Sequence, residues 1–96
     1  MENEVAGEIV SGVVRSASAH YGQSSSMEHI IYKLMCGSDQ VEIFAAGHVA
    51  DHIRRISKGQ ARISVSGSYE LLDLPAGRGK REARRIFVAK QAHSQA

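Results

Sequence analysis

The sequence predicts a small protein built mainly of β-strands, in which five strands form a closed barrel and one short helix lies between the third and fourth strands. The chain has 96 residues, which is enough for one modest hydrophobic core and too few for two. Strand-like segments occupy most of it, and a single amphipathic helical pattern interrupts them. We therefore expect residues 1–96 to form one domain, with flexible ends at 1–7 and 91–96.

The first half of the chain predicts three consecutive antiparallel strands. Residues 9–17 are rich in valine and isoleucine and contain Gly12, and a glycine inside a strand often marks a bulge or a sharp bend of a barrel. Residues 18–27 are rich in serine and predict a polar loop. The second strand is expected at 28–36 and the third at 41–47, joined by the turn-forming residues 37–40.

The helix follows the third strand directly and ends at Lys58-Gly59, where glycine can take the left-handed conformation of a helix stop. Its two faces differ in character. The apolar face carries Val49, Ala50, Ile53 and Ile56, and the polar face carries Asp51, Arg54 and Arg55. About ten residues are too few for a stable isolated helix, so we expect this one to pack on the sheet and close one end of the barrel.

The second half of the chain predicts two more strands. Residues 62–71 alternate between an apolar face and a serine-rich face, as in a strand with one side in water. Residues 84–90 are expected to turn Ile86 and Val88 inward and to leave Arg85, Phe87 and Ala89 on the opposite face. Between these strands, residues 73–83 predict a mobile basic hairpin arm. Five strands with a helix after the third follow the order of the OB fold.

The positions of glycines relative to the predicted strands and helix resemble those in the bacterial single-stranded DNA-binding proteins and their primosomal relatives. A strand ends in Ala46-Gly47, a short helix begins with Val49-Ala50, and Lys58-Gly59 precedes I-S-V-S-G at 63–67. The family pattern has a strand ending in Phe-Gly, a short helix, Lys-Gly, and Val-x-Val-x-Gly. Gly12 followed by V-V-R is similar to the first strand of the family. The resemblance implies an OB fold that binds single-stranded DNA.

Some features depart from that family. Ala46 stands where an aromatic residue is usual, the sequence has no tryptophan, and it ends in Q-A-H-S-Q-A rather than in an acidic tail. A specialised relative of phage, plasmid or accessory replication origin is the expectation that follows.

Charges are segregated along the chain although the net charge is only +2. Acidic residues dominate the first half, where Arg15 and Lys33 are the only basic residues, and cations dominate the second half. A cationic surface suits the phosphates of a nucleic acid. The alternative is a solvated face that keeps the protein soluble.

Single-strand binding needs cations along the phosphates and flat rings on which bases can stack. Phe44 and Phe87 are the candidate rings, the alternative for both being a core or a dimer interface, and Tyr21 in the serine-rich loop is a third. We expect Tyr32 and Tyr69 to pack in the core. The candidate cations are Arg62, Arg78, Lys80, Arg81, Arg84 and Arg85, with Arg15 and Lys33 from the first half. Arg54, Arg55 and Lys58, on the helix and at its end, are expected to be solvated.

No catalytic pattern is recognisable, so we expect no enzyme and no cofactor. His48 and His52 have a helical spacing but lack a third ligand, so no metal site is predicted. Cys36, the only cysteine, is expected to be a buried inert thiol. No apolar run approaches the roughly 18 residues of a membrane helix, and the N-terminus has no secretory character, so a cytoplasmic protein without membrane contact is expected.

The function predicted from the sequence is non-catalytic binding of single-stranded DNA with little sequence specificity, accessory to replication, recombination or plasmid and phage DNA handling. The alternative is an OB-type interaction subunit that docks onto a replication or secretion partner without nucleic acid. Ile31, Met35 and Leu72 fall on otherwise polar faces and suggest a subunit or partner contact. Replication proteins are possible partners, and a homodimer or higher homo-oligomer is expected.

Overall fold

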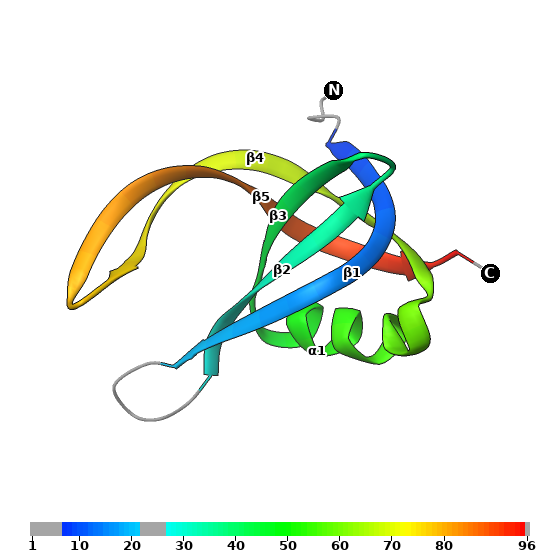
Figure 1. Cartoon of the computed structure of the whole chain (residues 1–96), viewed down its shortest axis with the longest axis horizontal. Helices are drawn as coiled ribbons and strands as arrows, with labels where there is room; N and C mark the ends of the chain where they lie inside the picture. Colours follow the sequence, from blue (N-terminus) through cyan, green and yellow to red (C-terminus); the bar gives the residue numbers. More distant parts are fainter. Residues whose placement is uncertain (1–6, 22–26, 96) are drawn as a thin grey trace, which may run out of the picture.

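The structure, a computed structural model, describes residues 7–21 and 27–95, apart from the side chains at positions 21, 27 and 28. Five strands close into a barrel in the order β1-β2-β3-β5-β4, and one helix lies between β3 and β4 (Figure 1). This architecture is the predicted OB fold. The elements are β1 Glu8–Tyr21, β2 Met27–Cys36, β3 Asp39–Ala45, α1 Gly47–Ile56, the 3₁₀ turn Lys58–Gln60, β4 Arg62–Gly77 and β5 Lys80–Ser94.

β1 closes the barrel because it pairs with two strands in succession. Its first half runs antiparallel to β4, with Glu8 opposite Gly67, and its second half runs antiparallel to β2, with Val13 opposite Met35. β1 passes from one partner to the other near Gly12, where a side chain would overlap the backbone carbonyl of Met35. The close approach explains why glycine stands at the bend, as the sequence predicted.

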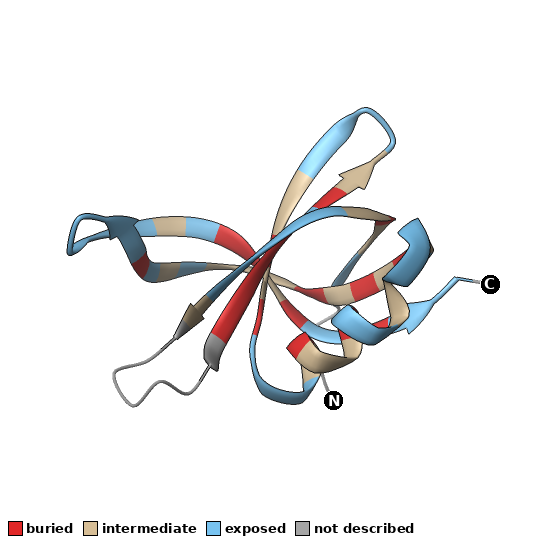
Figure 2. Cartoon of the chain, turned by 60° about the horizontal axis from the view of Figure 1, so that its bottom comes forward, coloured by how far each residue is buried: buried red, intermediate tan, exposed pale blue. Residues whose placement is uncertain are grey.

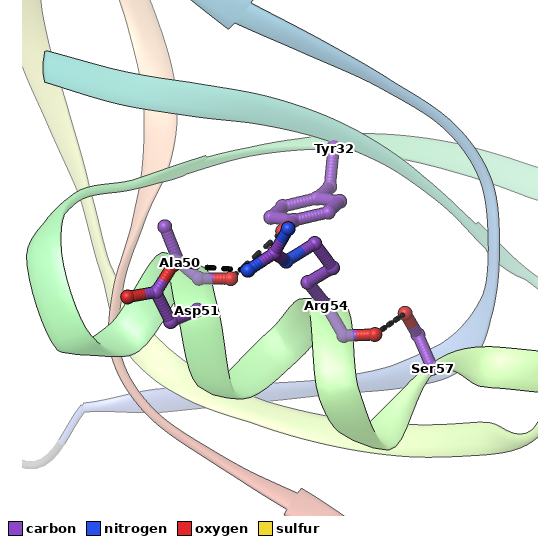
Figure 3. Close-up of polar contacts among 5 residues, drawn as sticks. All are labelled: Tyr32, Ala50, Asp51, Arg54 and Ser57. Atoms are coloured by element: carbon purple, nitrogen blue, oxygen red, sulfur yellow. Dashed lines mark hydrogen bonds and ion pairs between the residues drawn. The ribbon is translucent and has the colours of Figure 1, made fainter. Parts of the chain in front are cut away.

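The barrel interior is a continuous apolar core. Leu34 of β2, Ile63 of β4 and Phe87 of β5 are all 0% exposed. The helix α1 covers one end of this core with Ala50 and Ile53, which confirms the predicted apolar face. The Tyr32 hydroxyl reaches from β2 to α1 and donates a hydrogen bond of 2.8 Å to the carbonyl oxygen of Ala50 (Figure 3).

The strands β1, β4 and β5 extend well beyond their predicted ends. β1 continues through residues 18–21, which were expected to form a loop, and β5 continues through residues 91–94, which were expected to form a flexible end. Ala92 in that end is buried. The hairpin arm predicted over 73–83 is present, and β4 and β5 continue into it and pair as far as the Arg78-Gly79 turn. Both turn residues have positive φ values, 54° and 74°, as in the tight turns that match strand twist.

Two hairpins, β1–β2 and β4–β5, extend beyond the barrel on the same side of the molecule (Figure 1). Leu74 and Ile86 of the β4–β5 hairpin are buried against Ile31 of β2. Phe44, Leu72 and Val88 pack around these three residues, and together the six form what we call the outer cluster. Residues at the hairpin tip remain exposed (Figure 2).

The predicted orientation of β5 is wrong. Phe87 and Ala89 face the barrel core, whereas Ile86 and Val88 belong to the outer cluster. Both sides of this strand are covered, so its residues are apolar on both faces and their alternation does not identify the inner one. Pairing with β3 sets the orientation, since Phe87 lies next to Ile43, itself a core residue.

Candidate nucleic-acid interface

The outer surface of the barrel between the two hairpins collects polar and aromatic side chains from neighbouring strands. On β2, Ile30, Tyr32 and Leu34 point into the core, so the residues between them point outward. The same alternation places Phe44 of β3 on the outside, as predicted, while Ile43 and Ala45 face the core.

Three rings form a row across this surface. The rings of His20 and His29 lie 4.7 Å apart with an angle of 13° between their planes, and those of His29 and Phe44 lie 4.6 Å apart at 28°. His20 and His29 face each other across the β1–β2 pair. His29 is buried in the middle of the row, and His20 and Phe44 at its ends are partly exposed. The row therefore offers aromatic surface at both ends to a stacking base.

A polar hollow of about 220 Å³ adjoins the His20 end of the row, and we call it the Arg84 hollow. It contains two cations and one carboxylate. Arg84 of β5 forms an ion pair with Glu42 of β3, and Lys33 of β2 lies directly opposite Glu42 in the strand register. The lining residues are Ser16, Ser18, His20, Ile31, Lys33, Glu42 and Arg84.

A second hollow of about 220 Å³ adjoins the Phe44 end, and we call it the Arg81 hollow. Arg81 donates hydrogen bonds from Nε to the Asp73 carboxylate at 3.1 Å and from Nη2 to the Asp73 backbone carbonyl at 2.8 Å. The lining residues are His29, Phe44, Leu72, Asp73, Leu74, Pro75 and Arg81. Both hollows are smaller than the roughly 300 to 1,000 Å³ typical of pockets for drug-sized ligands.

The structure brings together some of the cations predicted to bind nucleic acid. Lys33, Arg81 and Arg84 line the two hollows, while Arg78 and Lys80 are exposed at the tip of the β4–β5 hairpin. Five of the eight candidate cations therefore lie on or beside the surface between the hairpins.

The other three candidate cations lie elsewhere. Arg85 follows Arg84 in the strand and so points to the opposite face of the hairpin, where its guanidinium carbon lies 5.7 Å from the centre of the Tyr69 ring. Arg62 begins β4, opposite Val13 and at the far end of the strand from the hairpin turn. Arg15 is exposed at a bulge of β1 and lines neither hollow.

The three rings predicted to stack on bases lie in different environments. Phe44 belongs to the ring row. The prediction that Phe87 is an exposed stacking ring is wrong, because Phe87 is fully buried in the barrel core. Tyr69 meets Phe87 edge to face at 5.3 Å and packs against that core, as expected of a core tyrosine. The backbone of Tyr21 pairs with Met27 at the end of β1, but its side chain lies outside the described residues.

His20 and His29 are the functional candidates that the sequence interpretation missed. The predicted loop over 18–27 removed His20 from the sheet, although it continues the two-residue spacing of Ser16 and Ser18. His29 precedes Ile30, a core residue, so strand alternation alone would have placed it on the outer face. The two-residue alternation, extended to the ends of both strands, would have identified these two histidines.

Of the three residues predicted to contact a partner, Ile31 is buried in the outer cluster and Leu72 packs against it while partly buried. Met35 is partly buried on β2. Arg54, Arg55 and Lys58 are exposed on and just after α1, in agreement with a solvated role.

Cys36 is half-buried, and this burial is the main cause that raises the pKa of its thiol. Within residues 7–21 and 27–95, no group of three or more His, Cys, Asp or Glu side chains is arranged to hold a metal ion. Over the same residues, no helix is long and apolar enough to cross a membrane.

The fold is similar to that of a small single-stranded DNA binding protein from Mycoplasma pneumoniae, with a TM-score of 0.65. The similarity covers 94% of this chain and 93% of that chain at 14% sequence identity. At this identity it establishes the shared fold. No family model matches the chain and no curated protein sequence is similar to it, so membership of the single-stranded DNA-binding family stays a prediction.

Proposed function

We propose that this protein binds single-stranded DNA without catalysing a reaction and with little sequence specificity. The observation that carries the proposal is the row of His20, His29 and Phe44, flanked by one arginine-containing hollow at each end. Stacking on aromatic rings contributes about 1 to 3 kcal/mol per base and accepts every base, because each has a flat face. The adjacent arginines are suited to the phosphates between stacked bases.

The geometry favours a single strand over a duplex. In a duplex the faces of the bases are stacked on one another, so rings on a protein surface can reach them only where the strand is unpaired. The hairpins β1–β2 and β4–β5 border the surface, and Arg78 and Lys80 extend its positive charge to the hairpin tip. The similar fold of the Mycoplasma protein, which is described as binding single-stranded DNA, supports the same proposal.

We place this binding in cytoplasmic processes that expose single strands, as an accessory to replication, recombination or the handling of plasmid and phage DNA. A homodimer or larger homo-oligomer is part of the proposal. Ile9 of β1 is 68% exposed and lines neither hollow. We assign the contact between copies to the surface around Ile9, which leaves the ring row accessible.

Fluorescence anisotropy of a labelled oligo-dT, titrated at several salt concentrations, tests the function. We expect binding that weakens steeply as salt rises, because cations on the protein replace counterions on the phosphates. Phe44→Ala should weaken binding roughly tenfold, in line with the loss of about one stacked base. An absence of binding at about 20 mM salt, where electrostatic attraction has a long range, would reject the proposal.

Leu71→Ala is the matched control for Phe44→Ala. It also truncates a large apolar side chain, but Leu71 is exposed and outside both hollows. Its affinity for oligo-dT should equal that of the wild type. Equal losses in the two variants would reject the assignment of Phe44 to the interface.

A further inference from the structure

The cations best placed for phosphate contact are already paired with carboxylates of the same chain. Arg84 is bound by Glu42 across the β3 and β5 strands, and both side chains are only partly exposed, 29% for Arg84 and 38% for Glu42. Glu42 thus lies on the surface between the hairpins, among the residues that line the Arg84 hollow.

The Arg81 hollow repeats this arrangement with a more exposed pair. Arg81 is held by the Asp73 carboxylate at 3.1 Å, with side-chain exposures of 58% and 66%. Arg81 also donates to the backbone carbonyl of Asp73, so this arginine keeps one partner even without the carboxylate. Each hollow therefore contains an arginine whose guanidinium is already paired with a carboxylate of the same chain.

We propose that Glu42 acts as an internal competitor for the phosphates of the bound strand, and that Asp73 does the same more weakly. This inference rests on the proposed binding of single-stranded DNA. A guanidinium presents the same planar set of donors to a carboxylate and to a phosphate, so Arg84 exchanges Glu42 for a phosphate when the strand enters the Arg84 hollow.

The exchange lowers both the affinity and its dependence on salt. When Arg84 transfers to a phosphate, the Glu42 carboxylate remains beside a polyanion and attracts a cation from solution. That uptake cancels part of the counterion release that drives binding. The chain thereby limits how tightly it holds a strand, which favours rapid release of the DNA.

The internal pair is suited to exchange because it is not essential for folding. Partly exposed ion pairs contribute little to stability, and the Arg84 hollow lies outside the apolar core. We therefore expect Glu42→Gln, which keeps the size of the side chain and removes its charge, to fold with nearly the thermal midpoint of the wild type.

Anisotropy titrations of oligo-dT with Glu42→Gln test the inference directly. We expect affinity at about 50 mM salt to rise roughly fivefold, the upper range for a partly exposed ion pair. The slope of log K against log salt should become steeper by about 0.7, the value for one additional phosphate contact on a single strand. Asp73→Asn should give a smaller gain in the same direction.

Asp51→Asn is the matched control, because it removes the same charge from an ion pair outside the interface. Oδ1 of Asp51 lies 3.7 Å from Nη2 of Arg54, three residues along α1 (Figure 3). Its effect on affinity measures what a change in net charge does by itself. A gain for Glu42→Gln no larger than that for Asp51→Asn would overturn the inference and leave the proposed function standing.

A double-mutant cycle with Arg84→Gln distinguishes two effects of Glu42→Gln: release of Arg84 from Glu42, and loss of the repulsion between the Glu42 carboxylate and the DNA. If Glu42 acts by holding Arg84, the gain from Glu42→Gln should largely disappear in the Arg84→Gln background. A gain of full size in that background would overturn the proposed exchange. If neither the wild type nor Glu42→Gln binds at about 20 mM salt, both the inference and the proposed function fail.

Discussion

Two phenylalanines on neighbouring strands have opposite environments. Phe44 of β3 and Phe87 of β5 lie one register position apart in the parallel pair that joins these strands, where Ile43 is next to Phe87 and Phe44 is next to Val88. Phe87 is fully buried inside the barrel, while Phe44 stacks on His29 at the outer surface. Because successive strand residues point to opposite faces, a step of one residue separates an aromatic ring of the core from one available to a ligand.

The inner and outer apolar groups differ in what they hold in place. The barrel core joins all five strands and α1. The outer cluster is smaller and attaches the β4–β5 hairpin to β2 through Leu74, Ile86 and Ile31. We therefore expect changes inside the barrel to affect global stability, and changes outside it to affect the hairpin and the binding of DNA.

Phe87→Ala should have the largest effect on folding. Removing a fully buried phenyl ring costs about 3 to 5 kcal/mol of unfolding free energy, because apolar contacts are lost and a cavity remains. Urea denaturation followed by circular dichroism measures the change. A loss below about 1 kcal/mol, well under the range for a core aromatic residue, would contradict the inner position of Phe87.

Leu74→Ala should loosen the hairpin more than it loosens the barrel. Leu74 is 3% exposed, and truncating a buried leucine costs about 2 kcal/mol or more. Because its contacts lie in the outer cluster, hydrogen exchange should accelerate for the amides of residues 71–86 before those of the core strands. Equal acceleration throughout the barrel would show that the two apolar groups act as one unit.

Arg84 and Arg85 provide a comparison between adjacent residues on opposite faces of one strand. Arg84→Gln should reduce the affinity for oligo-dT several-fold. Hydrogen bonds to charged groups contribute about 1.5 to 3 kcal/mol, and part of this free energy is offset because the phosphate must displace Glu42 from Arg84. Arg85→Gln removes the same charge beside Tyr69 and should have a smaller effect. Titrations at one salt concentration compare them, and a larger loss for Arg85→Gln would place the interface on the other face of the hairpin.

Tyr32→Phe should have the smallest effect on stability, about 1 kcal/mol for the loss of one buried hydrogen bond. The Tyr32 hydroxyl donates to the Ala50 carbonyl. Burial is the main cause that raises the pKa of Tyr32, with a smaller contribution from Asp51, and Arg54 opposes the shift.

The contribution of Tyr32 should therefore depend on pH in one direction. A raised pKa in the folded state means that the contribution is complete below the pKa of the unfolded chain and is lost as pH rises through the folded pKa. The stability difference between wild type and Tyr32→Phe should stay constant at neutral pH and shrink at alkaline pH. Thermal unfolding across that range measures it, and a difference that grows with pH would contradict a buried neutral phenol.

The predictions that succeeded rest on local patterns. Val49, Ala50, Ile53 and Ile56 share a helical face wherever the helix packs, and the alternation in β3 separates Phe44 from Ile43 without reference to another strand. The order of strands and helix, together with the glycine at position 12, was enough to predict the barrel. Lys33, Arg81 and Arg84 were chosen by charge and lie beside the ring row, and their contact with nucleic acid stays a prediction.

The sequence by itself thus determined the number and order of elements and the helix face, because these depend on periodicity over a few residues. Only the tertiary structure decided which side of β5 is inner, since both sides are apolar and pairing with β3 selects one. Tertiary contacts also brought His20, His29 and Phe44 into one row and paired Arg84 with Glu42. These side chains come from different strands, and barrel closure sets the distances between them.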